Sequence, residues 1–396
     1  MMSARDQPPL GGWDVDFVAR NASDAPTGPA VCEVCDDAVG TRILSWLELD
    51  AAVEACARAI LARTPPGTRV ACVARDGVAP LVALHACYRA RRAFVAMDHA
   101  SWPSVRLRAI AVDARCASVV CADDDETRRA RGWFGDTIDA YVSLESLDAR
   151  RDDDDDDDDE RRSPDEPLED DRNARVPSLA ANDPASSSSS SRELYVAYTS
   201  GSSGFGAKGT VALADAVMSY CAAKIAVERV RSSSRVCLAS NPTFDIYPSD
   251  AYVAAASRAC AVVASRTLFQ ADFTAVLRRG AVTHVCCTPT LFSLARLPGG
   301  WDDAPRLRVV SLAGERMSAE TLELWGGGDE DDDDDDDDDD ENEEGENKRK
   351  SKTSKNFYVP PQKSTTFGNS AATERVAFED LMRRTKKKKF NNRTFR

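Results

Sequence analysis

The sequence lacks the features that mark a membrane or secreted protein. Over its 396 residues no apolar run approaches the ~20 residues that a membrane-spanning helix needs. The first residues, MMSARDQPPLGG, have no apolar core of the kind found in a signal peptide. We therefore expect a cytoplasmic protein with no membrane partner.

Histidine is scarce too, with three in the whole chain. They form no spaced cluster, which argues against a histidine-based catalytic dyad. His284 lies in an apolar run and is expected in the core or a pocket wall.

Cysteine is plentiful, with 12 residues, but most lie inside apolar runs, where a free thiol acts as a small hydrophobe. This placement indicates a reducing compartment. Cys32 and Cys35 have CxxC spacing without a second pair or a nearby histidine, so we expect no metal site there.

The net charge of -15 comes largely from two acidic stretches, an aspartate run at 152–159 and a second stretch at 329–344. Such stretches repel themselves and bury no apolar surface, so they are predicted to be disordered. The charge is therefore no guide to the folded part. Basic clusters occur only at 348–350 and 386–389, and we read them as a solvated tail with no nucleic-acid partner.

Apolar segments alternate between short strand-like runs and longer helix-like runs over 69–122 and 194–325. Repeated strand-then-helix units with nearly continuous apolar strands predict an α/β fold, with largely parallel sheets covered by helices. We expect residues 1–150 to form the first part of a domain and 193–326 the second. A disordered acidic and serine-rich insert, 151–192, separates them, and 327–396 form a disordered tail.

Residues 195–211, YVAYTSGSSGFGAKGTV, are the most informative stretch. A strand-like run ends abruptly, and small hydroxyl or glycine residues follow it. Glycines let a loop bring its N–H groups close to an anion, and hydroxyls donate to phosphate oxygens. Lys208 then supplies a positive charge, so the stretch predicts a grip for nucleotide phosphates.

Other phosphate loops fit less well. A Walker loop needs Gly-Lys followed by Ser or Thr, whereas Lys208 stands between Ala207 and Gly209. Residues 204–209 match GxGxxG, the dinucleotide fingerprint, but KGTVAL looks like a strand and not a helix opening. A flexible Ser/Gly linker would not be flanked by two strand-like runs.

The stretch resembles the phosphate loop of the AMP-forming adenylate-forming enzymes, which include acyl-CoA synthetases and the adenylation domains of peptide synthetases. Their pattern is an aromatic residue, TSG, two hydroxyl residues, Gly, a spacer, Pro, Lys and Gly. This chain has one extra residue, and Ala207 stands at the usual proline. Five other segments resemble the family in the required order: 41–63, 89–98, 241–249 (NPTFDIYPS), 282–291 (VTHVCCTPTL) and 308–315 (RVVSLAGE).

The resemblance implies a role for several residues. The β- and γ-phosphates of ATP would be held by the loop residues Thr199, Ser200, Gly201, Ser202, Ser203 and Gly204. Lys208 would be catalytic and would neutralise pyrophosphate as it forms. Gly314 and Glu315 would lie against the adenine, although Gly314 also suits an ordinary strand-to-helix turn. ATP and Mg²⁺ are the implied cofactors.

Asp245 is open to two interpretations. In amino-acid-activating relatives the aspartate of this segment pairs with the substrate's α-amino group, and a carboxylate suits that role. Alternatively, Asp245 caps the helix that follows. Phe244 and Tyr247 are expected to pack rather than bind.

The implied reaction joins a carboxylic acid, an amino acid being one option, to AMP and passes the acyl group to a thiol such as coenzyme A or a carrier arm. The family's later segments, which contact the adenine, hold the ribose and supply a C-terminal lysine, have no clear match in this sequence. FGNSAATE at 367–374 resembles the adenine-contacting segment only weakly. We therefore expect a truncated, weakly active or inactive chain. A non-catalytic nucleotide-binding scaffold and a dinucleotide-binding domain remain alternatives.

Overall fold

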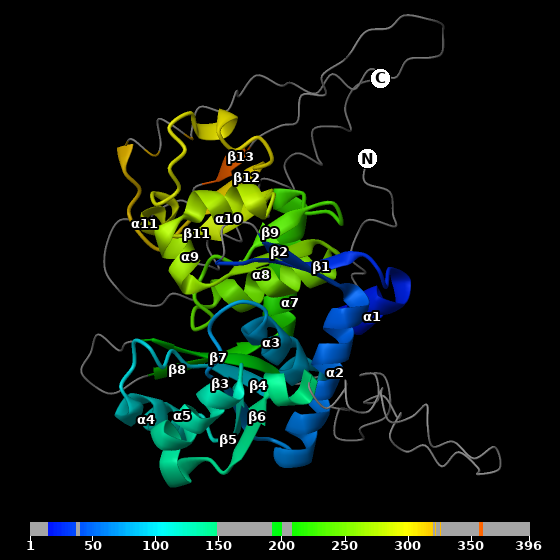
Figure 1. Ribbon diagram of the computed structural model, residues 1–396, viewed down its shortest axis with the longest axis vertical. Helices are drawn as coiled ribbons and strands as arrows, with labels where there is room; N and C mark the ends of the chain where they lie inside the picture. Colours follow the sequence, from blue (N-terminus) through cyan, green and yellow to red (C-terminus); the bar gives the residue numbers. More distant parts are fainter. Residues whose placement is uncertain are drawn as a thin grey trace, which may run out of the picture.

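The computed structural model describes residues 15–36, 40–148, 192–199, 208–319, 321, 325 and 356–358. Figure 1 shows its arrangement. The strands are β1 Pro29–Val34, β2 Thr41–Ser45, β3 Arg69–Cys72, β4 Ala93–Ala96, β5 Cys116–Cys121, β6 Ala140–Ser143, β7 Glu193–Thr199, β8 Lys208–Leu213, β9 Arg235–Cys237, β10 Cys260–Ala264, β11 His284–Cys287, β12 Val309–Leu312 and β13 Asn356–Tyr358. The α-helices are α1 Phe17–Asp24, α2 Trp46–Arg63, α3 Ala79–Arg89, α4 Ser104–Asp113, α5 Asp124–Phe134, α7 Ala214–Glu228, α8 Ile246–Ala256, α9 Arg266–Ala271, α10 Phe273–Arg279 and α11 Pro289–Phe292. Two 3₁₀ turns are η1 Gly135–Thr137 and η3 Gly300–Asp302.

The strands form two sheets. One has seven strands in the order β13-β12-β11-β9-β10-β1-β2, and only its edge pair β1–β2 is antiparallel. The other has six in the order β6-β5-β3-β4-β7-β8, and only its edge pair β7–β8 is antiparallel. The predicted fold class, largely parallel sheets covered by helices, is therefore confirmed.

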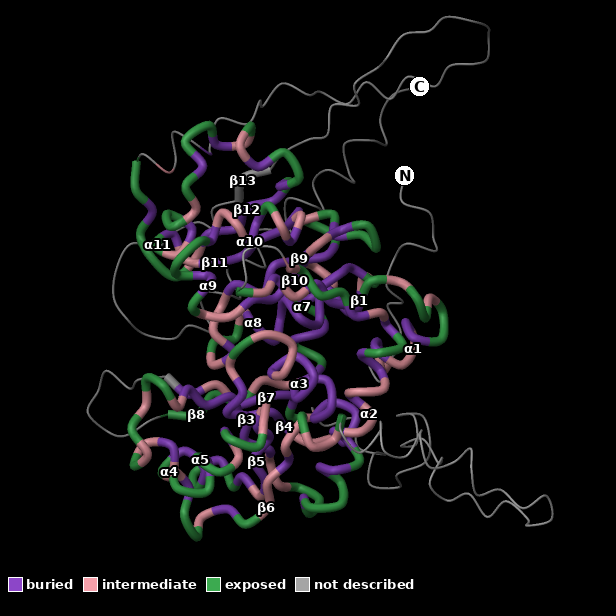
Figure 2. Tube along the Cα trace, in the orientation of Figure 1, coloured by how far each residue is buried: buried purple, intermediate pink, exposed green. Residues whose placement is uncertain are grey.

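Helices lie between the two sheets and on their outer faces (Figure 1). Apolar residues of α2, α3, α7 and α8 join both sheets in one central core. Helices α9, α10 and α11 cover the outer face of the seven-stranded sheet, and α4 and α5 cover that of the six-stranded sheet. Figure 2 shows buried residues running through both sheets. Because the two sheets share this core, the strand ends of one sheet are held close to those of the other.

Most predicted helices and strands are present, with shifts of a few residues at their ends. The sequence did not predict α9, which ends at Ala271, and the side chain of the next residue, Asp272, accepts a hydrogen bond from Ala275 N at the start of α10. The sequence did not predict α1, β1, α5 or β6, and it did not predict the short strand β13, which pairs with β12.

The cysteines are free, and every one except Cys35 is buried, as their apolar surroundings predicted. His284 is also buried, within β11. Its Nε2 lies 3.0 Å from the Glu228 carbonyl oxygen and its Nδ1 lies 2.7 Å from Thr283 Oγ1. These contacts fit the predicted role in the core.

A buried arginine ties the first three helices together. The Arg89 side chain, 3% exposed, contacts Asp16 Oδ2 and Asp50 Oδ1 at 2.6 Å each, and Glu54 Oε2 at 3.0 Å. Burial alone would raise the pKa of Asp16, but the hydrogen bond and charge of Arg89 hold that pKa below its usual value. Because the cluster is buried, removing its arginine would leave buried carboxylate charge without its main compensating cation.

Most of the predicted insert and tail lie outside the described residues. No helix in the described part of the chain is both long enough and apolar enough to cross a membrane.

Candidate functional site

The topology points to a ligand site at the carboxyl ends of the strands. In the seven-stranded sheet β9 leads through α8 to β10 on one side, whereas β11 leads to β12 on the other. In open α/β sheets ligands bind where such connections diverge, outside the carboxyl ends of the strands. Asp245 follows β9, Thr290 lies in α11 directly after β11, and Glu315 lies in the turn after β12. The six-stranded sheet has a similar divergence between β3 and β5.

Strands β7 and β8 hold the two ends of the predicted phosphate loop together. They pair antiparallel, and Thr199 at the end of β7 is opposite Lys208 at the start of β8. Lys208 is exposed. Ser200, Gly201, Ser202, Ser203 and Gly204 lie outside the described residues. The structure therefore fixes where the loop leaves and rejoins the sheet.

Close packing against Tyr198 explains why position 209 is a glycine, which the sequence alone did not reveal. Gly209 is opposite Tyr198 in the β7–β8 pair, and a Cβ at Gly209 would lie 2.8 Å from Tyr198 Cζ. The Tyr198 hydroxyl donates a 2.6 Å hydrogen bond to Asp113 Oδ2, which fixes the ring. Burial and this carboxylate both raise the pKa of Tyr198. A residue without a side chain is thus needed directly after Lys208.

Helix α11, which follows β11, is linked to the turn after β12 by two hydrogen bonds. Gly314 has a φ of 88°, which an L side chain rarely adopts. Glu315 Oε2 accepts a 3.1 Å hydrogen bond from Thr290 N and another from the Thr290 hydroxyl. The sequence-predicted pair Gly314 and Glu315 is therefore exposed at the carboxyl edge.

Asp245 is exposed and directly precedes α8. Its side chain makes no capping hydrogen bond to this helix, so the capping interpretation is not supported. Its carbonyl oxygen accepts a 2.8 Å hydrogen bond from Ser249 Oγ. Tyr247 is buried as expected, but Phe244 is 62% exposed, so the prediction that it packs is wrong. Phe244 lies in a tight turn whose N–H bonds to Asn241 O, and this turn directs it outward.

A buried charge cluster lies beside this segment. Lys224 Nζ contacts Glu228 Oε1 at 3.1 Å and Asp250 Oδ1 at 3.2 Å, and its side chain is 7% exposed. Burial raises the pKa of Asp250 to about 6, although Lys224 opposes the shift. Ser311 Oγ of β12 donates to Glu228 Oε1 at 2.8 Å. The cluster fixes α8, which follows Asp245, against α7 and β12. The i,i+4 spacing of Lys224 and Glu228 was its only sequence signal.

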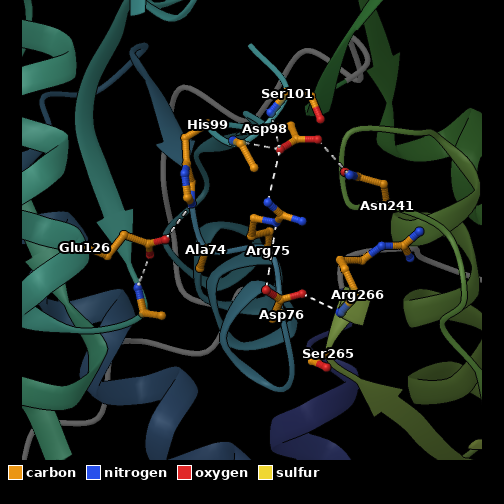
Figure 3. Close-up of polar contacts among 12 residues, drawn as sticks. Ala74, Arg75, Asp76, Asp98, His99, Ser101, Glu126, Asn241, Ser265 and Arg266 are labelled. Atoms are coloured by element: carbon orange, nitrogen blue, oxygen red, sulfur yellow. Dashed lines mark hydrogen bonds and ion pairs between the residues drawn. The ribbon is translucent and has the colours of Figure 1, made fainter. Parts of the chain in front are cut away.

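A second polar cluster joins the carboxyl edges of the two sheets (Figure 3). Asn241 Nδ2 donates to Asp98 Oδ2 at 3.1 Å, and Arg266 N donates to Asp76 Oδ1 at 2.7 Å. Arg75 lies between the two carboxylates, 3.8 Å from an oxygen of each. Burial opposes ionisation of Asp98, but hydrogen bonds and Arg75 together lower its pKa. Sequence reasoning missed these residues because they meet only in the folded chain.

His99 lies at the other end of this cluster (Figure 3). Its Nε2 is 3.0 Å from Glu126 Oε1, and its ring stacks on Trp133 at 4.4 Å between centroids. Glu126 Oε2 also accepts a 2.7 Å hydrogen bond from Ala122 N. These contacts satisfy the buried carboxylate of Glu126, in the first turn of α5, and they give His99 a structural role.

The described residues hold no group of three His, Cys, Asp or Glu side chains that fits a metal ion. We therefore assign no protein ligand to Mg²⁺. This ion is bound in many enzymes by substrate phosphates and water with few protein ligands.

Two largely parallel sheets covered by helices, with polar residues gathered at the carboxyl edge, define an α/β protein. The family model for AMP-binding enzymes matches residues 18–327. The chain therefore belongs to the AMP-binding enzyme family.

Sequence relatives include biosynthetic enzymes. The chain is 30% identical to novobiocin biosynthesis protein H of Streptomyces niveus over 308 residues, which is 77% of this chain and 46% of the relative. It is 24% identical to the nonribosomal peptide synthetase nanA of Aspergillus nanangensis, over 78% of this chain and 11% of that protein. The chain thus spans less than half the length of these relatives.

Solved structures share the fold. VinN in complex with 3-methylaspartate has a TM-score of 0.59 at 18% identity, over 79% of this chain and 74% of VinN. ATP-bound MatB from Rhodopseudomonas palustris also has a TM-score of 0.59 at 18% identity, over 78% of this chain and 57% of MatB. The N-terminal domain of FACL13 from Mycobacterium tuberculosis gives 0.59 at 15% identity, over 80% and 73%.

Proposed function

We propose that this chain carries the large-domain part of an ATP-dependent enzyme that activates a carboxylic acid as an acyl-adenylate. The acyl group would then pass to a thiol such as coenzyme A or a carrier arm. The observation that carries the proposal is the pairing of Thr199 with Lys208, within a chain of the AMP-binding family. This pairing closes a hydroxyl- and glycine-rich loop at the end of a parallel sheet.

In the proposed reaction a substrate carboxylate oxygen bonds to the α-phosphorus of ATP while the bond from that phosphorus to the bridging oxygen breaks. Pyrophosphate leaves with the negative charge. An anion must approach another anion, so the main task of the protein is positioning and charge neutralisation. Mg²⁺ carried by the triphosphate would share that neutralisation.

Each named residue has a part in this proposal. Thr199, Ser200, Gly201, Ser202, Ser203 and Gly204 hold the β- and γ-phosphates. Lys208 neutralises the leaving pyrophosphate from its exposed position at the start of β8. Gly314 has no side chain and so leaves room for the adenine. Glu315, which is hydrogen-bonded to Thr290, lies beside the adenine.

We further propose that Asp245 pairs with the ammonium group of an amino-acid substrate. The carboxylate is exposed and caps no helix, so it is available to a ligand. The solved complexes of VinN with 3-methylaspartate and with L-aspartate are consistent with such a substrate class, although the likeness to VinN is one of fold.

Two adenylate analogues test the proposal. A non-hydrolysable aminoacyl-adenylate analogue should bind more tightly than ATP, because it spans the nucleotide and acyl sites together. Asp245→Asn should weaken the amine-bearing analogue and leave the analogue without the amine unchanged. If both analogues bind no better than ATP, acid activation is refuted.

The alternative is a non-catalytic nucleotide-binding scaffold. Such a protein would bind ATP, and it would bind neither adenylate analogue more tightly than ATP. The dinucleotide-binding alternative is disfavoured, because Lys208–Leu213 forms strand β8 where that fingerprint requires a helix. Pyrophosphate exchange on this chain alone is expected to be weak, and strong carboxylate-dependent exchange would contradict that expectation.

A further inference from the structure

A basic hollow lies at the amino edge of the six-stranded sheet, away from the carboxyl edge described above. Its volume is ≈ 630 Å³, within the range of small-molecule sites. The charged residues that line it are Arg69, Arg91, Arg115, Arg192, Asp113 and Glu193. Each arginine stands at or just before the start of one of the neighbouring strands β5, β3, β4 and β7.

The charges in this hollow do not balance. Glu193 is held by Arg69 through two contacts, from Nε at 2.8 Å and from Nη2 at 3.0 Å. Asp113 accepts the hydroxyl hydrogen bond from Tyr198. Four guanidinium groups thus face two carboxylates. The Arg115 side chain is exposed and makes no hydrogen bond or ion pair with any residue that the structure describes.

Two of the four arginines also make hydrogen bonds to backbone carbonyls of the fold. Arg69 Nη1 donates to Ala114 O at 2.9 Å, and Arg192 Nη2 donates to Tyr88 O at 3.3 Å, so both arginines satisfy carbonyls at helix ends. Arg91 and Arg115 follow helices α3 and α4, and each has a φ of 52°. Glycine adopts this conformation more easily, by roughly 1 kcal/mol. Replacement of either arginine by glycine should therefore leave the backbone conformation intact.

We propose that this hollow binds the phosphate group of a small ligand as a dianion, at a site separate from the proposed ATP site. Guanidinium groups bind phosphate oxygens with charge-assisted, often bidentate hydrogen bonds, and the surplus of two positive charges matches a dianion. Strand β7 starts in the hollow at Glu193 and ends at Thr199. At ~3.3 Å per residue, the phosphate loop begins about 20 Å away.

The test compares inorganic phosphate binding by the wild type, by Arg91→Gly/Arg115→Gly, and by Arg229→Gly as a matched control. Arg229 also has a positive φ, 53°, but lies outside the hollow at the end of α7. Glycine suits all three positions, so the variants should fold, which their thermal unfolding checks. Isothermal titration is run at constant ionic strength set with chloride, and is repeated in a Lys208→Ala background.

The double variant should bind phosphate at least about tenfold more weakly than the wild type in both backgrounds, since it loses two charge-assisted contacts. Arg229→Gly should bind phosphate as the wild type does. The proposal is overturned if the double variant retains wild-type affinity, if the control loses affinity equally, or if the wild type binds no phosphate. A loss that appears only when Lys208 is intact would place the phosphate in the loop, which also overturns the proposal.

Discussion

Replacing Gly209 by alanine should damage the base of the phosphate loop. The new Cβ would lie 2.8 Å from Tyr198 Cζ and 2.9 Å from its hydroxyl oxygen, closer than real Cβ contacts allow. The Tyr198 ring cannot move without breaking its 2.6 Å hydrogen bond to Asp113. Overpacking of this kind costs about 1–3 kcal/mol, and we expect Gly209→Ala to be destabilised by that amount.

Urea unfolding measures this loss, with Gly132→Ala as the control. Gly132 lies in α5, and a Cβ there would meet nothing within 4 Å. Alanine at that position should raise stability by roughly 0.5–1 kcal/mol, because it favours the helix.

A double-mutant cycle isolates the contact between the two strands. Tyr198→Leu removes the ring atoms that the new methyl group would meet, so Gly209→Ala should cost at least about 1 kcal/mol less in that background. ATP affinity should fall in Gly209→Ala as well, because a shifted strand carries Lys208 with it. Equal stability of Gly209→Ala and the wild type would refute this reasoning.

Two further predictions concern buried charges. Arg89→Ala should lose about 3–5 kcal/mol in urea unfolding, because it removes the buried cation that contacts Asp16, Asp50 and Glu54; a loss below ~1 kcal/mol would contradict the assigned role. Burial raises the pKa of Asp250 to about 6 from an unfolded value of about 3.9, so the folded state binds more protons between these values. Stability should therefore fall by roughly 2–3 kcal/mol as pH rises from 4 to 7, and Asp250→Asn should remove this part of the slope; identical slopes in the two proteins would show that Asp250 does not titrate there.

Much of the fold could be predicted from local patterns. Apolar strands such as β3, β5 and β11 stand out because both of their faces are buried. Helix α5 was missed because its sequence, DDETRRARGWF, is largely charged, and only three of its residues are buried. The break between α9 and α10 depends on one capping aspartate, which periodicity does not show.

The candidate site was only partly predictable. The phosphate loop and the turn at Gly314 are continuous in sequence, so their patterns could be recognised. The bridge from Asp98 to Asn241 joins residues 143 positions apart, and the cluster around Lys224 combines α7, α8 and β12. Such contacts depend on the packing of the layers, and no local pattern encodes them.

The most direct test of the account is an ATP titration of the wild type and of Lys208→Ala, with Arg128→Ala as the control for an exposed cation in α5. The loop is expected to hold the triphosphate, so Lys208→Ala should bind ATP at least about tenfold more weakly, while the control binds it like the wild type. Equal ATP affinity of all three proteins would contradict the claim that the loop between β7 and β8 is a nucleotide site.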